Sequence, residues 1–458
     1  MKLIQQICTG VLILSAACSW AQQPDTTPAP PVPAVVGREN NGDQMLTPPP
    51  VSGQSYPTSF SSGERSNYLR GGLAFTAAYT DNARPSETGQ PISDVSYSVA
   101  PFLALDETTP RLHWVLTYAP GFTFYRRLSA LNETDQNAAI DVQYRLSPHV
   151  TFSARDGFQK SSNVFNQPDL GSSQIVSGGT QQPNFSVIAP IADRLSNSGN
   201  VGITYQFAAN GMVGASGTFS NLHYPNPTEV PGLFDSSSQA GSAFYSYRAS
   251  KMHYIGATYE YQRLVTYPTS GQSETQTHAF LFFYTLYATP KFSISFFGGP
   301  QHSDTLLPPQ PPLLLPLPQV RSWNPAAGGS LSWQGPRTNV AASYSHIVSG
   351  GGGLISAVRM DSASASIRQQ LARRLSGAVE GSYVQNDILG GALIGASNGH
   401  TVGGTGSLEQ QFGQHIYVRA GYTRLHQDYS SVAVLAATPN TNREFISISY
   451  QFSRPLGR

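Results

Sequence analysis

In the segment 445–452, which reads Phe-Ile-Ser-Ile-Ser-Tyr-Gln-Phe, apolar and polar residues alternate without a break from Ile446 onward. Ile446, Ile448, Tyr450 and Phe452 occupy alternate positions, with small or polar residues between them. An extended backbone sends successive side chains to opposite faces, so this pattern predicts a β-strand with one apolar and one polar face. Because the same period recurs along most of the chain, each strand is expected to face an apolar medium on one side and water on the other.

Seven further segments show the alternation clearly, at 73–79, 112–118, 138–144, 201–207, 280–286, 292–296 and 416–422. Weaker examples cover 95–105, 150–159, 212–221, 240–248, 253–264, 327–334, 338–348, 357–370, 375–386 and 400–412. With the final strand, these segments predict about eighteen strands.

The connections between these segments are alternately short and long. The short ones lie at 106–110, 147–148, 208–211, 249–251, 289–290, 335–336, 373–374 and 413–414. The long ones lie at about 81–93, 127–136, 160–195, 222–238, 265–274, 303–321, 349–355, 387–399 and 428–442. This parity predicts an all-β fold, a transmembrane antiparallel up-and-down β-barrel with both chain ends on the side of the tight turns. Aromatic residues that follow tight turns, such as Tyr254 and Tyr417, suit the interfacial girdles, although ordinary β-propensity explains them equally well.

The N-terminus is predicted to be an export signal, residues 1–21, with Lys2 ahead of an apolar stretch at 7–17 and cleavage after Ala21. A lipid-modified Cys18 is the alternative. Both cysteines, Cys8 and Cys18, fall inside this signal, so the processed chain would contain no disulfide and no cysteine metal site.

Residues 22–62 form a proline-rich segment with little to bury, which predicts a periplasmic linker. The alternatives are that this segment threads into the barrel as a plug or that it binds a periplasmic partner. The barrel itself is expected over 63–458.

Composition supports a membrane barrel and excludes other classes. Charged residues make up 12% of the chain, which carries 43 Gly, 23 Tyr and 22 Phe, whereas soluble domains average about 25% charged residues. No basic run suggests nucleic acid as a partner. No apolar run is long enough for a membrane helix, since 313–315 is flanked by prolines, so a membrane form must be a barrel.

With these features the chain resembles bacterial outer-membrane β-barrel proteins of the porin-like kind, over about residues 68–452. The resemblance rests on the signal, the alternation, the turn parity and the terminal aromatic strand. It implies the outer membrane of a Gram-negative bacterium, contacts with lipid and lipopolysaccharide, assembly by the barrel-assembly machinery and a possible homo-oligomer. Six residues follow Phe452, whereas such chains usually end on the aromatic residue.

Charges on the face opposite the lipid are candidates for lining a water-filled lumen. By the alternation they are Asp141, Arg145, Arg155, Glu260, Arg368, Glu380, Glu409 and Arg419. Four are acidic and four are basic, so strong ion selectivity is not expected. The alternative is that they pair across neighbouring strands and only stabilise the wall.

The longest connection, residues 160–195, is the candidate constriction by resemblance to general porins, which fold an external loop into the pore. Its named residues are Phe165, Asp169, Phe185 and Asp193. Amides and aromatic rings suit neutral, hydroxyl-rich solutes, but an ordinary surface loop has the same composition. A second loop, at 306–318, is rich in Leu and Pro and would be adhesive if exposed.

No catalytic motif, metal-ligand spacing or cofactor motif is found, although His302 beside Asp304 is a conceivable rim site. The predicted function is passive diffusion of small polar solutes through an outer-membrane channel that is not an enzyme and uses no cofactor. The alternatives are exopolysaccharide secretion with a periplasmic complex, and a structural or adhesive barrel with a blocked lumen.

Overall fold

The computed structural model describes residues 45, 67–84, 90–163, 191–226, 233–268, 271–289, 291–307, 319–351, 355–389, 398–429 and 436–456. All of them belong to one compact unit, Ala34–Arg458. The predicted signal and most of the proline-rich segment therefore lie outside the described residues.

The described residues form nineteen strand segments and one short 3-10 helix. These are β1 (Tyr68–Arg84), β2 (Ile92–Thr108), β3 (Leu112–Tyr118), β4 (Gly121–Tyr125), η1 (Ser129–Leu131), β5 (Glu133–Arg145), β6 (Val150–Asn163), β7 (Ile191–Ala208), β8 (Gly211–His223), β9 (Asp235–Arg248), β10 (His253–Tyr267), β11 (Ser273–Thr289), β12 (Phe292–Leu306), β13 (Val320–Gln334), β14 (Thr338–Gly351), β15 (Ile355–Ala372), β16 (Leu375–Ile388), β17 (Gly399–Phe412), β18 (Ile416–Tyr429) and β19 (Asn440–Pro455). No helix among them is long and apolar enough to cross a membrane.

Residues 112–125 form one wall strand in two pieces. Both β3 and β4 pair with β2 on one side and with β5 on the other, and Pro120, which has no backbone N–H, lies between them. The Ala119 amide donates to the Asn137 carbonyl at 2.8 Å, and Asn137 Nδ2 donates to the Ala119 carbonyl at 3.2 Å. Counted as one, β3 and β4 give eighteen wall strands, which confirms the predicted fold class and strand number.

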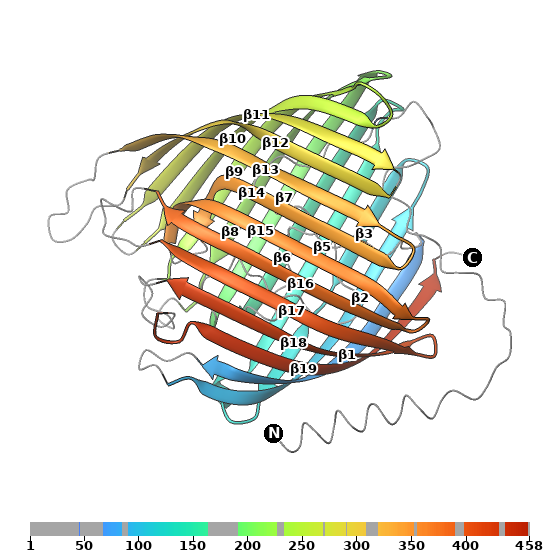
Figure 1. Cartoon of the computed structure of the whole chain (residues 1–458), viewed down its shortest axis with the longest axis vertical. Helices are drawn as coiled ribbons and strands as arrows, with labels where there is room; N and C mark the ends of the chain where they lie inside the picture. Colours follow the sequence, from blue (N-terminus) through green and yellow to red (C-terminus); the bar gives the residue numbers. More distant parts are fainter. Residues whose placement is uncertain are drawn as a thin grey trace. The chain divides into compact units, whose positions relative to one another are not determined.

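The sheet closes on itself. Each strand pairs with its neighbours along the chain, and β1 pairs antiparallel with β19, with Tyr68 opposite Pro455. All eight predicted tight turns join neighbouring strands, and they lie at the same end of the barrel as Tyr68 and Pro455. We call this end the tight-turn mouth; in Figure 1 the orange and red hairpins reach it on the right.

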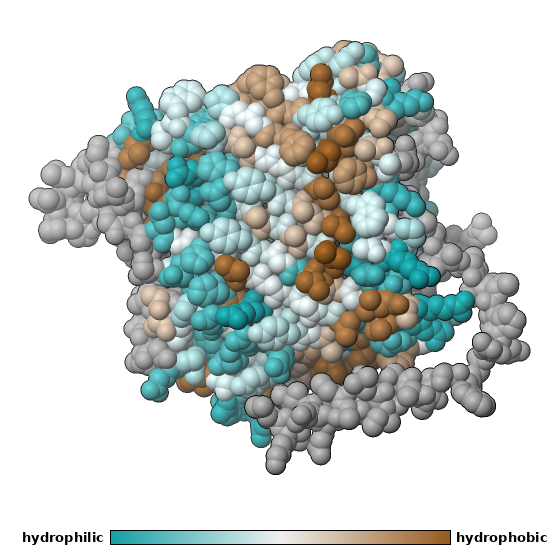
Figure 2. Space-filling view, viewed as in Figure 1, coloured by the Kyte–Doolittle hydropathy of each residue, from teal (hydrophilic) through white to brown (hydrophobic). Residues whose placement is uncertain are grey.

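The outer face carries the predicted apolar residues. Phe280 and Phe282 are exposed by 46% and 60%, while Leu281 between them is exposed by only 2%. The alternation around the wall exposes, among others, Phe75, Tyr97, Leu116, Phe124, Ile140, Phe158, Ile203, Phe219, Tyr245, Ile255, Phe296, Trp333, Tyr344, Ile367, Val379, Leu408, Ile416 and Ile448. Figure 2 shows apolar residues in a band across the strands on one face, with hydrophilic residues gathered on either side of it. A continuous apolar band is what lipid contact requires.

The strands are longer than predicted, and they extend at the end opposite the tight turns. Strand β7 begins at Ile191 rather than at 201, and β9 begins at Asp235 rather than at 240. A strand of 17 residues, such as β11, is roughly 55 Å long and rises about 40 Å at a tilt near 45°, more than the apolar band of about 25 Å. Some residues that were predicted to lie in the long loops therefore belong to the strands of the barrel wall.

Many glycines of the wall lie directly opposite an aromatic residue. Gly256 pairs with Phe283 and Gly421 pairs with Phe445, and in each pair the ring covers the glycine. A Cβ atom on Gly256 would collide with the Phe283 ring and with the Tyr245 carbonyl oxygen. Gly–aromatic pairs of this kind join strands at Gly72, Gly199, Gly214, Gly328 and Gly399 as well. The many glycine and aromatic residues of the sequence thus pack against each other across neighbouring strands of this sheet.

Besides His223, the last residue of β8, five histidines share the outer face on the side of the long loops. Tyr259 Oη lies 2.8 Å from His278 Nδ1, and the ring of His302 stacks edge-on against Trp323 at 4.8 Å between centroids. The five are His278, His302, His346, His400 and His426. Amphipathic rings favour the lipid–water interface, so the fold gathers there residues that are scattered in sequence.

Candidate functional site

The inner wall carries all eight of the predicted lumen charges. Six of them directly follow or precede an exposed apolar residue of the outer face, in the pairs Ile140–Asp141, Tyr144–Arg145, Tyr259–Glu260, Ile367–Arg368, Val379–Glu380 and Leu408–Glu409. Arg155 and Arg419 lie three residues from Phe158 and Tyr422, which are also exposed. An odd separation along a strand reverses the face, so the structure places the eight side chains on the inner face. Whether they line an open pore stays a prediction.

Four of the eight form one cluster on β15–β18. Arg368 Nη2 lies 3.4 Å from Glu409 Oε1 across the intervening strand β16, and Glu409 is directly opposite Arg419. Arg419 donates to Ser407 Oγ at 3.0 Å, and its guanidinium lies 5.9 Å from the centre of the Phe445 ring. Among the described residues, Glu380 Oε1 has no hydrogen-bond partner. The cluster therefore contains one charge pair across the wall and one inner carboxylate oxygen without a hydrogen bond, while a role in a lumen stays a prediction.

A second group of inner charges lies on β1–β6. Asp141 and Arg155 are directly opposite each other on β5 and β6. Closer to the tight-turn mouth, Asp106 is held by Arg70 Nη2 at 3.2 Å and by His113 Nε2 at 3.3 Å. These contacts tie β1, β2 and β3 together through one carboxylate, which is only 6% exposed as a residue. Asp106, Arg70 and His113 are functional candidates that the alternation alone did not single out.

Glu260 on β10 forms no hydrogen bond or ion pair with any described residue. It lines a small recess with Gln262, Thr277 and Gln301. A carboxylate beside amide and hydroxyl groups offers acceptors and donors to a polar solute.

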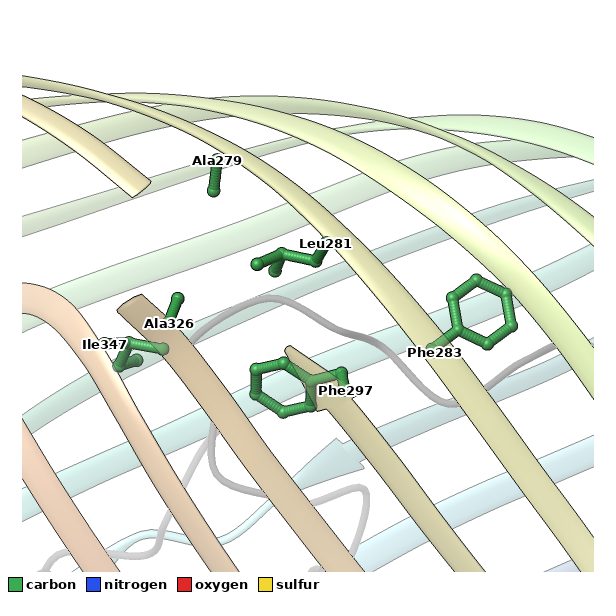
Figure 3. Close-up of a cluster of buried hydrophobic side chains, with 6 residues drawn as sticks. All are labelled: Ala279, Leu281, Phe283, Phe297, Ala326 and Ile347. Carbon is green, nitrogen blue, oxygen red and sulfur yellow. The ribbon is translucent and has the colours of Figure 1, made fainter. Parts of the chain in front are cut away.

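The rest of the lining of this recess is apolar and mostly belongs to a larger apolar cluster, which corrects the expectation of a uniformly polar inner face. The cluster consists of Ala279, Leu281, Phe283, Phe297, Ala326 and Ile347 (Figure 3). Met360 packs against it. Phe283 is directly opposite Phe297. The run 279–283 is apolar on both faces of β11, which was the available sequence signal for this cluster.

The predicted constriction is corrected at both of its ends. Lys160 lies in β6 and Asp193 in β7, so both belong to the wall rather than to a loop. Asp193 Oδ1 accepts a hydrogen bond from Ser162 Oγ at 2.6 Å. Phe165, Asp169 and Phe185 lie outside the described residues, as does most of the Leu/Pro loop at 306–318.

At the long-loop rim next to Asp193, Arg194 and Tyr224 lie together on β7 and just beyond β8. Tyr224 packs with Ala192 and Leu233, and its amide donates to Asp235 Oδ1 at 2.9 Å. Burial raises the pKa of the Tyr224 phenol, and the Arg194 guanidinium partly offsets this rise. These contacts hold the wall strands on both sides of the β8–β9 connection.

His302 and Asp304, the conceivable rim site, each contact a different residue and not each other. His302 stacks on Trp323, and Asp304 Oδ2 lies 3.4 Å from Arg321 Nε. Both residues have the outer parity of β12, where Phe296 is exposed. Within the described part of the chain, no group of three or more His, Cys, Asp or Glu side chains is placed to hold a metal ion.

No protein-family model matches the chain, and no curated protein matches it. Among solved structures, OpdQ of Pseudomonas aeruginosa is similar with a TM-score of 0.41 at 10% identity, over 84% of this chain and 98% of that one. OccK2 (OpdF) of the same species, solved with glucuronate, gives a TM-score of 0.40 at 10% identity, over 84% and 98%. The FrpB iron transporter of Neisseria meningitidis (F3-3 variant) gives 0.39 at 10% identity, over 80% of this chain and 62% of its own length. The closed β-barrel fold of this chain follows from its own strand pairing.

Proposed function

We propose that the protein is an outer-membrane channel through which small polar solutes diffuse passively. The observation that carries this proposal is a closed barrel of eighteen wall strands with an apolar outer face and eight charges of both signs on the inner face. Barrels of sixteen to eighteen strands are too wide for their own side chains to fill, so they leave an aqueous path.

The inner charges favour weak rather than strong ion selection. Arg368 and Glu409 compensate each other at 3.4 Å, and Asp141 faces Arg155 directly. A lumen with paired charges presents local dipoles instead of one dominant sign, and neutral or zwitterionic solutes cross such a field at low cost. The hydroxyl and amide groups around Glu260 add hydrogen-bonding positions for such solutes.

The proposal includes the location and the processing of the chain. Residues 1–21 would direct export and be removed, and the barrel would be inserted into the outer membrane of a Gram-negative bacterium by the assembly machinery. Its outer face would contact lipid and lipopolysaccharide. The connection at 164–190 would narrow the path, in which case deleting residues 165–190 raises the conductance.

Single-channel recording of the purified, full processed chain in planar bilayers tests this function. The proposal expects discrete ohmic current steps in KCl and swelling of proteoliposomes in isosmotic solutions of small sugars. The absence of both, from protein that migrates as a folded barrel, would contradict it and favour a blocked structural barrel.

A further inference from the structure

The structure brings one residue of the proline-rich segment into contact with the wall. Met45, the one described residue ahead of Asn67, is 5% exposed, and its amide donates to the side-chain oxygen Oε1 of Gln206 at 3.1 Å. Gln206 lies on β7. A methionine side chain is buried only where neighbouring groups cover it, so the wall must provide a surface that fits Met45.

That surface is a cradle of four side chains from four consecutive strands. Met45, Met212 and Tyr254 form one buried cluster, and Phe244 and Tyr287 pack against it. The rings of Tyr254 and Tyr287 meet edge to face at 5.5 Å. A thioether is polarizable and packs favourably against aromatic rings, so the cradle suits a methionine side chain.

The cradle faces the lumen. Val213, Tyr245, Ile255 and Leu286, each adjacent in sequence to a cradle residue, have the outer parity of their strands, so Met212, Phe244, Tyr254 and Tyr287 point inward. This overturns the expectation that Tyr254 belongs to an outer aromatic girdle, and Tyr417 likewise has the inner parity of β18.

The cradle also lies at the tight-turn mouth. Gln206 and Tyr287 come just before the ends of β7 and β11, and Met212 and Tyr254 come just after the starts of β8 and β10. Barrel strand β1 starts at this same mouth, at Tyr68. The stretch from 45 to 68 can therefore begin and end at one mouth of the barrel.

We propose that this cradle binds the N-terminal segment inside the mouth through Met45, so that the segment is a docked part of the channel and not a free periplasmic linker. The docking stands on the contacts above, while its effect on flow rests on the proposed channel function. An extended chain has a cross-section of roughly 50 Å², against a lumen of several hundred Å² in a barrel of this width, so docking narrows the mouth by about a tenth.

Cross-linking tests the docking without reference to transport. In the full processed chain, whose predicted signal with Cys8 and Cys18 has been removed, Met45→Cys is combined with Met212→Cys, and a short bismaleimide is added to the folded barrel. The expected result is an intramolecular link between the two positions, located by mass spectrometry. Met45→Cys with Val213→Cys is the matched control, because Val213 lies next to Met212 on the outer face, and it should not link.

If both cysteines of the first pair react singly with maleimide but do not link, the docking is wrong. The pair Met45→Cys and Gln206→Cys repeats the test should Met212→Cys fail to fold.

Conductance tests the consequence for flow. Met45→Asp places a charge in an apolar cradle and should release the segment, raising the single-channel conductance by about a tenth or more. Gln414→Asp places the same charge at the same mouth, in the exposed turn between β17 and β18 and outside the cradle, and should leave the conductance unchanged. If the cysteine pairs link but Met45→Asp has the wild-type conductance, the segment docks without narrowing the mouth. That result would overturn the proposed narrowing and leave the channel function standing. Absence of current from the wild type and from Met45→Asp alike would overturn the channel function while leaving the cross-link result standing.

Discussion

Arg368 Nη2 lies 3.4 Å from Glu409 Oε1, although the whole of strand β16 separates their strands. The two side chains reach over the inner face of β16, beside Arg419 on β18. Because both charges lie on the inner face, the proposed channel function predicts that changing one of them alters the field along the path.

The variant Arg368→Ala removes a positive charge and leaves Glu409 uncompensated by it. A unit charge about 7 Å from an ion in water changes its free energy by roughly 0.6 kcal/mol, which corresponds to about a threefold change in local concentration. We therefore expect the reversal potential in a KCl gradient to shift toward cation preference. The control is Arg359→Ala on the same strand, since Arg359 has the outer parity and pairs with Asp387 at 2.8 Å. Equal shifts for both variants would contradict the assignment of faces.

Gly256 and Gly406 should respond in opposite directions to alanine. A Cβ on Gly256 collides with Phe283 and with the Tyr245 carbonyl, whereas a Cβ on Gly406 meets nothing within 4 Å. Gly256→Ala should lower the free energy of unfolding by about 1–3 kcal/mol through overpacking. Gly406→Ala should raise it by about 0.5 kcal/mol, because alanine restricts the unfolded chain. Denaturant titration in lipid vesicles measures both, and destabilisation of similar size at the two positions would argue against the Gly–aromatic packing.

Arg70 should matter more to stability than Arg321, although each pairs with an aspartate. Arg70 and Asp106 have side chains exposed by only 16% and 9%, while that of Arg321 is exposed by 68%. Arg70→Met leaves the Asp106 carboxylate without its guanidinium partner and should cost about 3 kcal/mol of unfolding free energy. Arg321→Met should cost less than about 1 kcal/mol. Denaturant titration in lipid vesicles measures the unfolding free energy of both variants. An equal loss for Arg70→Met and Arg321→Met would show that the Asp106 contacts do not hold the start of β1.

Phe282 tests lipid contact directly, because it projects from the middle of the outer face of β11. Arginine at this depth should lower the free energy of unfolding in vesicles by about 2–4 kcal/mol. Phe282→Leu keeps the side chain apolar and serves as the control, with a much smaller expected loss. Tolerance of arginine as readily as leucine would mean that this face does not meet hydrocarbon.

Removal of the predicted signal has a chemical signature. The only cysteines are Cys8 and Cys18, so the exported protein should start at Gln22 and should not react with a maleimide reagent after denaturation. Intact-mass measurement and labelling check this, and retention of Cys18 with an added lipid mass would instead support the lipoprotein alternative.

The wall could be predicted from sequence because its determinant is local. Alternation at Ile446, Ile448 and Tyr450 fixes which face meets lipid, and a one-residue shift would reverse every side chain. The inner or outer placement of the eight charges followed from the same parity. Strand ends could not be predicted as well, because beyond the bilayer both faces meet water and the alternation fades, as at Ile191–Asn200 of β7.

Most contacts on the inner face were not predictable, because no local pattern encodes them; the run 279–283, apolar on both faces of β11, was the one signal available. Tyr254 looked like a girdle residue by its place after a turn, yet it faces inward to Met45. The apolar inner cluster around Leu281 and Phe297 contradicts the rule that a lumen is polar. Met45 itself sits in a segment without periodicity, and only the three-dimensional closure of the barrel shows what it meets.

Current recorded while the inner wall is modified chemically tests the central claim most directly. Ala378→Cys on the inner face of β16 and Val379→Cys on its outer face are treated with a charged, water-soluble methanethiosulfonate during single-channel recording. We expect a stepwise change of current for Ala378→Cys and no change of current for Val379→Cys. A steady current from both variants, or no current from either, would contradict a solute path along the inner wall of this barrel.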